Sequence, residues 1–171
     1  MRKAILATIV AALAGTFALA GPAVAGPGPD RAAVPASTPL TTWWSGARED
    51  NFSSGTAAGD SAATAAGYSF VRNEGYLHTT QVSGTRPLYL FWSAARGDNF
   101  TTSTQVGIDS AYAAGYTYVR VEGYVGTSGG RPLYLFWNEA RGDNFTTATQ
   151  VGIDSAYAAG YTYVRVEGYL H

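Results

Sequence analysis

An internal repeat constrains this chain more than any other feature. Three segments of 38 residues, 39–76 (unit one), 87–124 (unit two) and 132–169 (unit three), share one residue pattern, and all insertions fall between them. Units two and three differ at only three of 38 positions, whereas unit one is more divergent. A segment this short cannot bury an apolar face alone. The repeat therefore predicts one domain in which three units share a core.

The pattern within unit two predicts two strands, a helix and a third strand. Segment 88–92 is apolar on both alternating faces, which predicts a strand covered from two sides. Turn-forming residues and the β-prone segment 99–102 follow, so the two segments predict a hairpin. A short capped helix is expected from about 103 to about 114, and 116–124 alternates as a half-exposed strand does.

We therefore expect an α+β, mainly β fold built from three ββαβ repeats. Three copies are too few for a long solenoid, so the units should close into a pseudo-threefold assembly. Two arrangements fit, a three-bladed propeller-like ring and a β-trefoil-like fold with helical insertions. We favour the ring, because the predicted helix leaves little room for the four strands that a trefoil unit needs.

The N-terminal segment, residues 1–25, has the pattern of a secretory signal peptide. Arg2 and Lys3 precede an uncharged run, and the small residues of 23–25 form an Ala-x-Ala site that predicts cleavage after Ala25. We expect a secreted, extracellular protein with no membrane span after cleavage. Arg2 and nine further arginines accompany a single lysine, Lys3, and this composition favours a bacterial source.

Residues 26–38 are rich in proline and glycine and contain little to bury. We expect a flexible arm that holds the domain away from the export machinery; a docking strand for a partner protein is the alternative. The remainder, 39–171, is predicted to be a single three-repeat domain.

Composition excludes several classes of function. The chain has no cysteine and two histidines, His78 and His171, so thiolate zinc sites, disulfides and three-histidine metal centres are excluded. A formal charge of −1 argues against nucleic-acid binding. Both histidines lie outside the repeated segments, and the acidic residues recur threefold instead of forming one catalytic pair. We expect no enzyme activity, no metal and no cofactor.

Each predicted hairpin carries the residue types of a sugar site. An aromatic ring can stack on a sugar face, while a carboxylate, an amide and a guanidinium can orient hydroxyl groups. The alternative is that Asp and Asn only shape the turn, Arg pairs with Asp, and Trp belongs to the core. The candidate ligand-binding residues are Trp44, Arg48, Asp50, Asn51, Trp92, Arg96, Asp98, Asn99, Trp137, Arg141, Asp143 and Asn144.

The last strand of each unit carries an Arg-x-Glu pair. A spacing of two on a strand places both side chains on one face. We expect a structural ladder of ion pairs, with a polar axial channel or anion site as the alternative; its residues are Arg72, Glu74, Arg120, Glu122, Arg165 and Glu167.

The recurring Pro-Leu-Tyr-x-Phe-Trp, Gly-Asp-Asn-Phe-x-Thr and Gly-Tyr-x-Tyr motifs resemble an uncharacterised repeat domain of unknown function. That domain occurs at the ends of secreted bacterial hydrolases and in small secreted proteins. The resemblance covers 39–169 and implies a secreted, non-catalytic accessory module for adhesion to a surface or glycan. Its turn usually contains His where this chain has Asn51, Asn99 and Asn144, so a role for that His does not transfer.

Together these observations predict a secreted, monomeric, lectin-like module that binds a glycan or cell-surface polymer through its repeated turns. The alternative is an adaptor subunit of a secreted assembly, for example a toxin-like one. It would bind another secreted protein through its N-terminal arm and use the repeat ring as a rigid hub.

Overall fold

The computed structural model describes residues 36–171. The predicted signal peptide, 1–25, and most of the predicted arm, 26–38, lie outside the described residues. The last two arm residues, Ser37 and Thr38, belong instead to the first strand. They are ordered because Ser37 pairs with His78 and the Thr38 hydroxyl donates to the Gly55 carbonyl.

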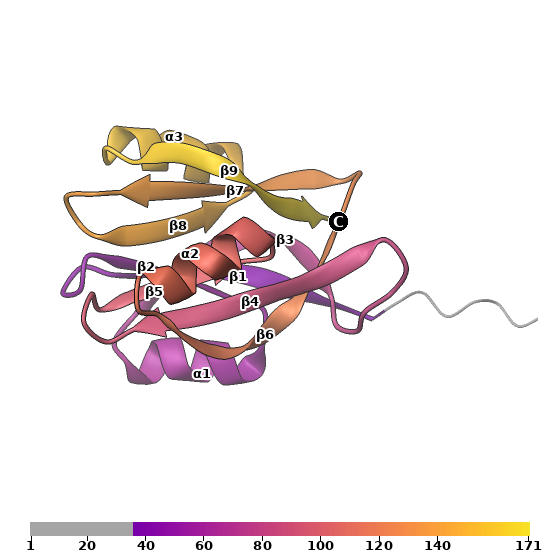
Figure 1. The fold of residues 1–171 in the computed structure, drawn as a ribbon, viewed down its shortest axis with the longest axis horizontal. Coiled ribbons are helices and arrows are strands. Elements are labelled where there is room, and N and C mark those ends of the chain that lie inside the picture. The colour runs from indigo at the N-terminus through magenta and orange to yellow at the C-terminus, as the bar shows by residue number, and fades with distance from the viewer. Residues whose placement is uncertain (1–35) are drawn as a thin grey trace, which may run out of the picture. The chain divides into compact units, whose positions relative to one another are not determined.

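Two strands, a helix and a strand follow one another three times in the described chain (Figure 1). Unit one contains β1 (Ser37–Ser45), β2 (Asp50–Ser54), α1 (Ala57–Ala65) and β3 (Ser69–His78). Unit two contains β4 (Thr85–Ser93), β5 (Asp98–Thr102), α2 (Gln105–Ala113) and β6 (Thr117–Gly126). Unit three contains β7 (Arg131–Asn138), β8 (Asp143–Thr147), α3 (Gln150–Ala158) and β9 (Thr162–Leu170). The predicted ββαβ order is therefore present in each unit.

Residues 36–171 are mainly β, as expected, and the nine strands in this range form one antiparallel sheet. Within each unit the first strand pairs with both others, giving β2-β1-β3, β5-β4-β6 and β8-β7-β9. Single residue pairs join β3 to β6 and β6 to β9. The path from β2 to β8 is open in the described residues, so the sheet order does not itself establish the expected closed ring or propeller. Each unit has three strands, one fewer than a trefoil unit needs.

The turn between the first two strands of each unit needs a left-handed backbone. Gly97 and Gly142 adopt it with φ of 71° and 69°, at no steric cost to a residue without a Cβ. Unit one has Glu49 at the corresponding position, with φ of 54°. This conformation is unfavourable for a residue with a side chain, so the turn of unit one is strained.

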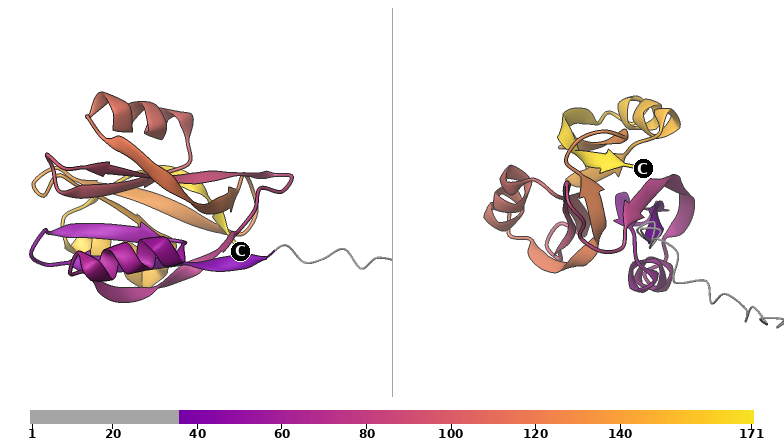
Figure 2. Two further views of the ribbon diagram at one scale, coloured as in Figure 1. Left: turned by 90° about the horizontal axis from the view of Figure 1, so that it is seen from below. Right: turned by 90° about the vertical axis from the view of Figure 1, so that its right-hand side faces the viewer.

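Each helix has nine residues and begins at a threonine cap: Thr104 accepts a hydrogen bond from the N–H of Gly107. That glycine lets the helix approach the sheet, because a Cβ there would lie 1.9 Å from the Thr102 hydroxyl oxygen. In the described chain, none of the helices is long and apolar enough to cross a membrane. Figure 2 shows the helices at the periphery of residues 36–171, with the strands between them.

One apolar cluster draws residues from all three units, in agreement with the predicted shared core. Its members are Leu40, Leu77, Leu88, Val125, Leu133, Ala148 and Leu170. Three further clusters lie under the helices, and two of them include a leucine from the following unit: Leu90 packs with Phe52, and Leu135 with Phe100. Units are thus joined by apolar burial as well as by strand pairing.

Candidate functional site

Three similar pockets lie where one unit meets the next. Each combines an arginine, a phenylalanine and a tyrosine of one unit with a tryptophan, an asparagine and a second arginine of the other. We name them after the tryptophan, as the Trp92, Trp137 and Trp44 pockets, with volumes of about 270, 280 and 310 Å³. These residues are Arg48, Phe52, Tyr68, Trp92, Asn99 and Arg120; Arg96, Phe100, Tyr116, Trp137, Asn144 and Arg165; and Arg141, Phe145, Tyr161, Trp44, Asn51 and Arg72.

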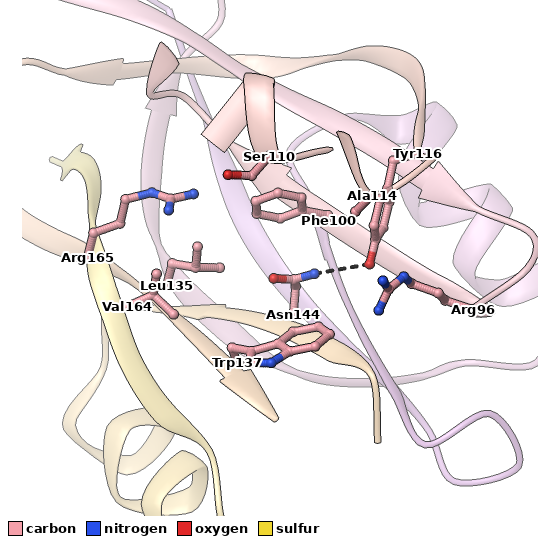
Figure 3. A pocket seen from close by; sticks show the side chains of 10 residues that line it. All are labelled: Arg96, Phe100, Ser110, Ala114, Tyr116, Leu135, Trp137, Asn144, Val164 and Arg165. Atoms are coloured by element: carbon pink, nitrogen blue, oxygen red, sulfur yellow. Dashed lines mark hydrogen bonds between the residues drawn. The ribbon is translucent and has the colours of Figure 1, made fainter. Parts of the chain in front are cut away.

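Figure 3 shows how the Trp137 pocket is built. Arg96 and Arg165 lie on opposite sides, with Trp137 and Asn144 between them. The guanidinium carbon of Arg96 is 5.8 Å from the ring centroid of Trp137 and 5.9 Å from that of Tyr116. These are cation–π contacts, so an exposed arginine is held beside the indole without a carboxylate partner.

The other two pockets repeat parts of this arrangement. Arg141 lies 5.5 Å from the Trp44 ring and 5.6 Å from the Tyr161 ring, and Arg48 lies 6.0 Å from the Tyr68 ring. Among the described residues, no turn arginine has a carboxylate oxygen within 4.0 Å. The alternative that Arg simply pairs with the Asp of its turn is therefore wrong.

The predicted site residues are regrouped across units. Trp92 and Asn99 lie directly opposite each other on paired strands, as do their counterparts in units one and three. Arg96, from the same turn as Asn99, instead lines the pocket of the next tryptophan, Trp137. The arginine of a turn thus contributes to a different pocket from the tryptophan and asparagine beside it in the sequence.

The three predicted aspartates are absent from the lining of these pockets. Asp50, Asp98 and Asp143 are buried, and one carboxylate oxygen of each lies within 4.8 Å of the others. The cluster is at the start of β2, β5 and β8, where three hairpins meet. No sequence pattern within a single unit indicates this convergence.

Each aspartate is bonded within its own unit and to the next one. Asp98 accepts a hydrogen bond from the hydroxyl of Tyr116 and another, of 2.8 Å, from the side-chain amide of Asn144. Asp50 is bonded in the same way by Tyr68 and Asn99, and Asp143 by Tyr161 and Asn51. The cluster therefore links the three hairpins through hydrogen bonds between units.

Burial and mutual repulsion shift the ionisation of this aspartate cluster. Burial, followed by the neighbouring Asp98 carboxylate, raises the pKa of Asp50 to about 7 and that of Asp143 to about 10. Burial and the adjacent carboxylate also raise the pKa of Tyr116. The cluster therefore retains at least one proton at neutral pH. Three carboxylate oxygens are suitable donors for a hard cation, but each of these carboxylates already accepts bonds from a tyrosine and an asparagine.

The predicted Arg–Glu pairs are present in all three units, each with an Nε–Oε1 distance of 2.6 Å. Each glutamate also accepts bonds at the start of a helix in another unit. Glu122 accepts 2.9 Å from the Gly55 N–H and 3.0 Å from the Thr56 hydroxyl, next to α1. A buried carboxylate at a helix N-terminus is favourable for the helix dipole. The pairs therefore join units, which supports the structural interpretation.

The glutamates differ in ionisation because they accept different numbers of bonds. Burial by itself would raise the pKa of Glu74, but the Ala148 N–H, the Arg72 charge and the Thr147 and Thr42 hydroxyls outweigh it and lower that pKa. Glu122 has no such pair of threonine hydroxyls, and burial raises its pKa. Glu122, which joins unit two to unit one, thus accepts fewer stabilising hydrogen bonds than Glu74, which joins unit one to unit three.

Sequence reasoning missed two groups of pocket residues. In the sequence, the phenylalanine and tyrosine of each pocket are predicted only as strand residues, and the strand arginines only as partners of glutamate. Their signal was their recurrence at one position in every unit. The contact between His78 and His171, whose ring centroids are 4.3 Å apart, is also not predicted from the sequence.

The comparisons with known proteins identify a family without assigning an activity. A model described as domain of unknown function matches residues 40–171, the three units together. No curated protein and no solved structure matches the chain. The chain therefore belongs to the family described as Domain of unknown function (DUF5648).

Proposed function

We propose that this protein is a secreted, non-catalytic module that binds carbohydrate in the three pockets between its units. The observation that carries the proposal is the recurrence of one lining, made of indole, amide and guanidinium groups, at three places in the domain. The secreted location rests on the signal-peptide pattern of 1–25.

The chemistry of the lining fits a sugar. A partly exposed tryptophan supplies an apolar face for the C–H groups of a sugar ring. The amide nitrogen of Asn144 is already used by Asp98 and Tyr116, which leaves its oxygen to accept from a hydroxyl group. The volumes are at the lower end of small-molecule sites, so each pocket suits a single sugar unit. Three pockets on one body would increase avidity for a repetitive polymer.

The non-catalytic part of the proposal rests on the separation of two groups of residues. No aspartate, glutamate or histidine lines the three pockets in the described chain. Asp50 and Asp143, whose pKa values are raised, are buried in the aspartate cluster, and Glu122, whose pKa is also raised, lies beside the start of α1 outside these three pockets. General acid–base chemistry needs such a group within hydrogen-bond reach of the substrate.

We further infer that the units close into the pseudo-threefold ring predicted from the sequence. Three equivalent backbone contacts support this, because His78 pairs with Tyr124, Gly126 with Tyr169, and His171 exchanges two hydrogen bonds of 3.1 Å with Tyr76. The asparagine-to-aspartate bonds support the same cyclic order, running from each unit to the one before it and from unit one to unit three. A closed ring would fix the geometry of all three pockets.

A second candidate, the protein adaptor, is favoured by apolar side chains exposed on two helices. Tyr112 is 58% exposed on α2 and Tyr157 is 57% exposed on α3, and a valine of each helix is more exposed than half. Exposed apolar groups of this kind occur at protein interfaces. This candidate predicts binding through the helices and the N-terminal arm, not through the pockets.

A glycan array and polysaccharide pull-down with the exported protein test the first candidate. Trp44, Trp92 and Trp137 are changed together to Ala, and Tyr112 with Tyr157 to Ala serves as the aromatic control. Carbohydrate binding predicts that the tryptophan variant loses retention while remaining folded by circular dichroism, and that the tyrosine variant keeps it. If the protein is an adaptor, the tyrosine variant should lose binding to a secreted protein partner, and the tryptophan variant should keep it. Failure of the parent protein to bind any glycan or cell-wall polysaccharide would overturn the carbohydrate proposal.

A further inference from the structure

We propose that the saccharide bound in these pockets carries an anionic substituent, a carboxylate or a sulfate, held between two arginines. This inference rests on the proposed carbohydrate function and specifies its ligand. It concerns the same three pockets and is based on the two arginines that line each of them.

Each pocket contains two guanidinium groups from different units and no acidic side chain. The pairs are Arg48 with Arg120, Arg96 with Arg165, and Arg141 with Arg72. In the Trp137 pocket the two arginines lie on opposite sides of the tryptophan and asparagine (Figure 3). A ligand seated on the indole would therefore be flanked by positive charge on both sides.

The strand arginines are held in position by contacts beneath the pocket. Arg165 bonds through Nε to Glu167 at 2.6 Å, and Arg120 lies over the ring of Phe52 at 5.9 Å. The Nη2 atoms of Arg120 and Arg165 have no hydrogen-bond acceptor within the described protein. Both Nη2 atoms are buried beside the helix starts, next to Gly59 and Gly107, so they fix these arginines in place, and each arginine side chain remains 21–24% exposed at the pocket wall.

The turn arginines carry the charge that no ion pair holds, although the charges of Glu49 and Asp143 also act on Arg141. The glutamate of each unit neutralises its strand arginine, whereas the turn arginines have no carboxylate within 4.0 Å in the described chain. Arg48 and Arg96 are exposed at the pocket rim. A neutral sugar would therefore leave the turn guanidinium of each pocket without an ion-pair partner. A guanidinium forms strong paired hydrogen bonds with carboxylate and sulfate oxygens.

The test compares one polymer in two charge states. A uronic-acid polysaccharide and its carboxyl-reduced, neutral form are titrated into the protein at low and high salt, together with a sulfated polysaccharide. Arg48, Arg96 and Arg141 are changed together to Gln, which preserves polar character and removes the charge. Arg131→Gln is the matched control, because Arg131 is exposed and lines no described pocket.

We expect an acidic polymer to bind at least tenfold more tightly than the neutral one at low salt, and the advantage to shrink as salt is raised. The triple glutamine variant should lose this preference but retain weak binding to the neutral polymer, and Arg131→Gln should keep the preference. The anionic ligand would be overturned if the protein bound both forms with equal affinity and the triple glutamine variant left that affinity unchanged. Carbohydrate binding itself would still hold if the tryptophan variant abolished the affinity. No binding to either form would overturn both.

Discussion

The buried aspartate cluster should make the stability of this protein fall as pH rises. In the folded state the pKa of Asp50 is raised to about 7 and that of Asp143 to about 10, against 3.8 for a free carboxyl group. The folded protein therefore holds protons that the unfolded chain releases. The stabilisation is complete below about pH 4 and is lost as pH rises through these folded-state values.

The Asp98→Asn variant tests this origin. Asp98 is the largest charge acting on both carboxyls, so its removal should lower both pKa values. A rise of about three units at Asp50 corresponds to about 4 kcal/mol of unfolding free energy lost between pH 4 and 7. Between pH 4 and 7 the unfolding free energy of the variant should fall by at least about 1 kcal/mol less than that of the parent, because the repulsion from Asp98 is removed.

The variant also has a cost that does not depend on pH. Asp98 accepts from the Asn144 backbone N–H and side chain and from Tyr116, and an asparagine cannot accept at both of its terminal atoms. We expect the variant to be about 1–3 kcal/mol less stable than the parent at pH 5, a difference that narrows towards pH 9.

Urea unfolding monitored by tryptophan fluorescence from pH 4.5 to 9.5 measures both effects. Asp109→Asn, an exposed aspartate of α2, is the matched control and should reproduce the parent curve. An Asp98→Asn curve parallel to that of the parent over the whole range would refute the reasoning.

Local backbone and side-chain geometry determines the expected effect of three further substitutions. Glu49→Gly should stabilise the protein by about 0.5–1 kcal/mol, because it relieves a left-handed backbone at φ of 54°; an unchanged urea midpoint would contradict this. Gly107→Ala should cost more than about 3 kcal/mol, because its Cβ would meet the Thr102 hydroxyl; a thermal midpoint within a few degrees of the parent would contradict this. NMR titration should give His171 a pKa below 6.5, from burial and the adjacent His78, that rises in His78→Gln; no change in that variant would exclude the histidine contact as a cause.

The helix caps and the order of strands within a unit can be predicted from the sequence because they depend on residues that are close together in the chain. Alternation of period two, turn residues and a threonine followed by a helix-compatible run predict a ββαβ unit without reference to distant residues. The start of β1 at Ser37 differs from the predicted boundary because its pairing partner, His78, is 41 positions away. Residues that are ordered by such long-range pairing have no local signal.

The candidate site was predicted by residue type but not by grouping. Tryptophan and asparagine come together because they are opposite each other in a hairpin, a relation that the turn length determines. The arginine that completes each pocket comes from another unit. Because units two and three are nearly identical, their sequences carry no information on whether Arg96 meets Trp92 or Trp137.

What the amino-acid sequence determined alone is therefore the number of units, the elements in each and the residue types offered to a ligand. The tertiary structure decided that three aspartates converge in the interior, that each glutamate binds the start of a helix of another unit, and that arginines from two different units line the pocket of each tryptophan. The physical reason is that backbone propensity and side-chain alternation act over a few residues. The relative placement of the units depends instead on how the shared apolar cluster packs, which is a property of all three units together.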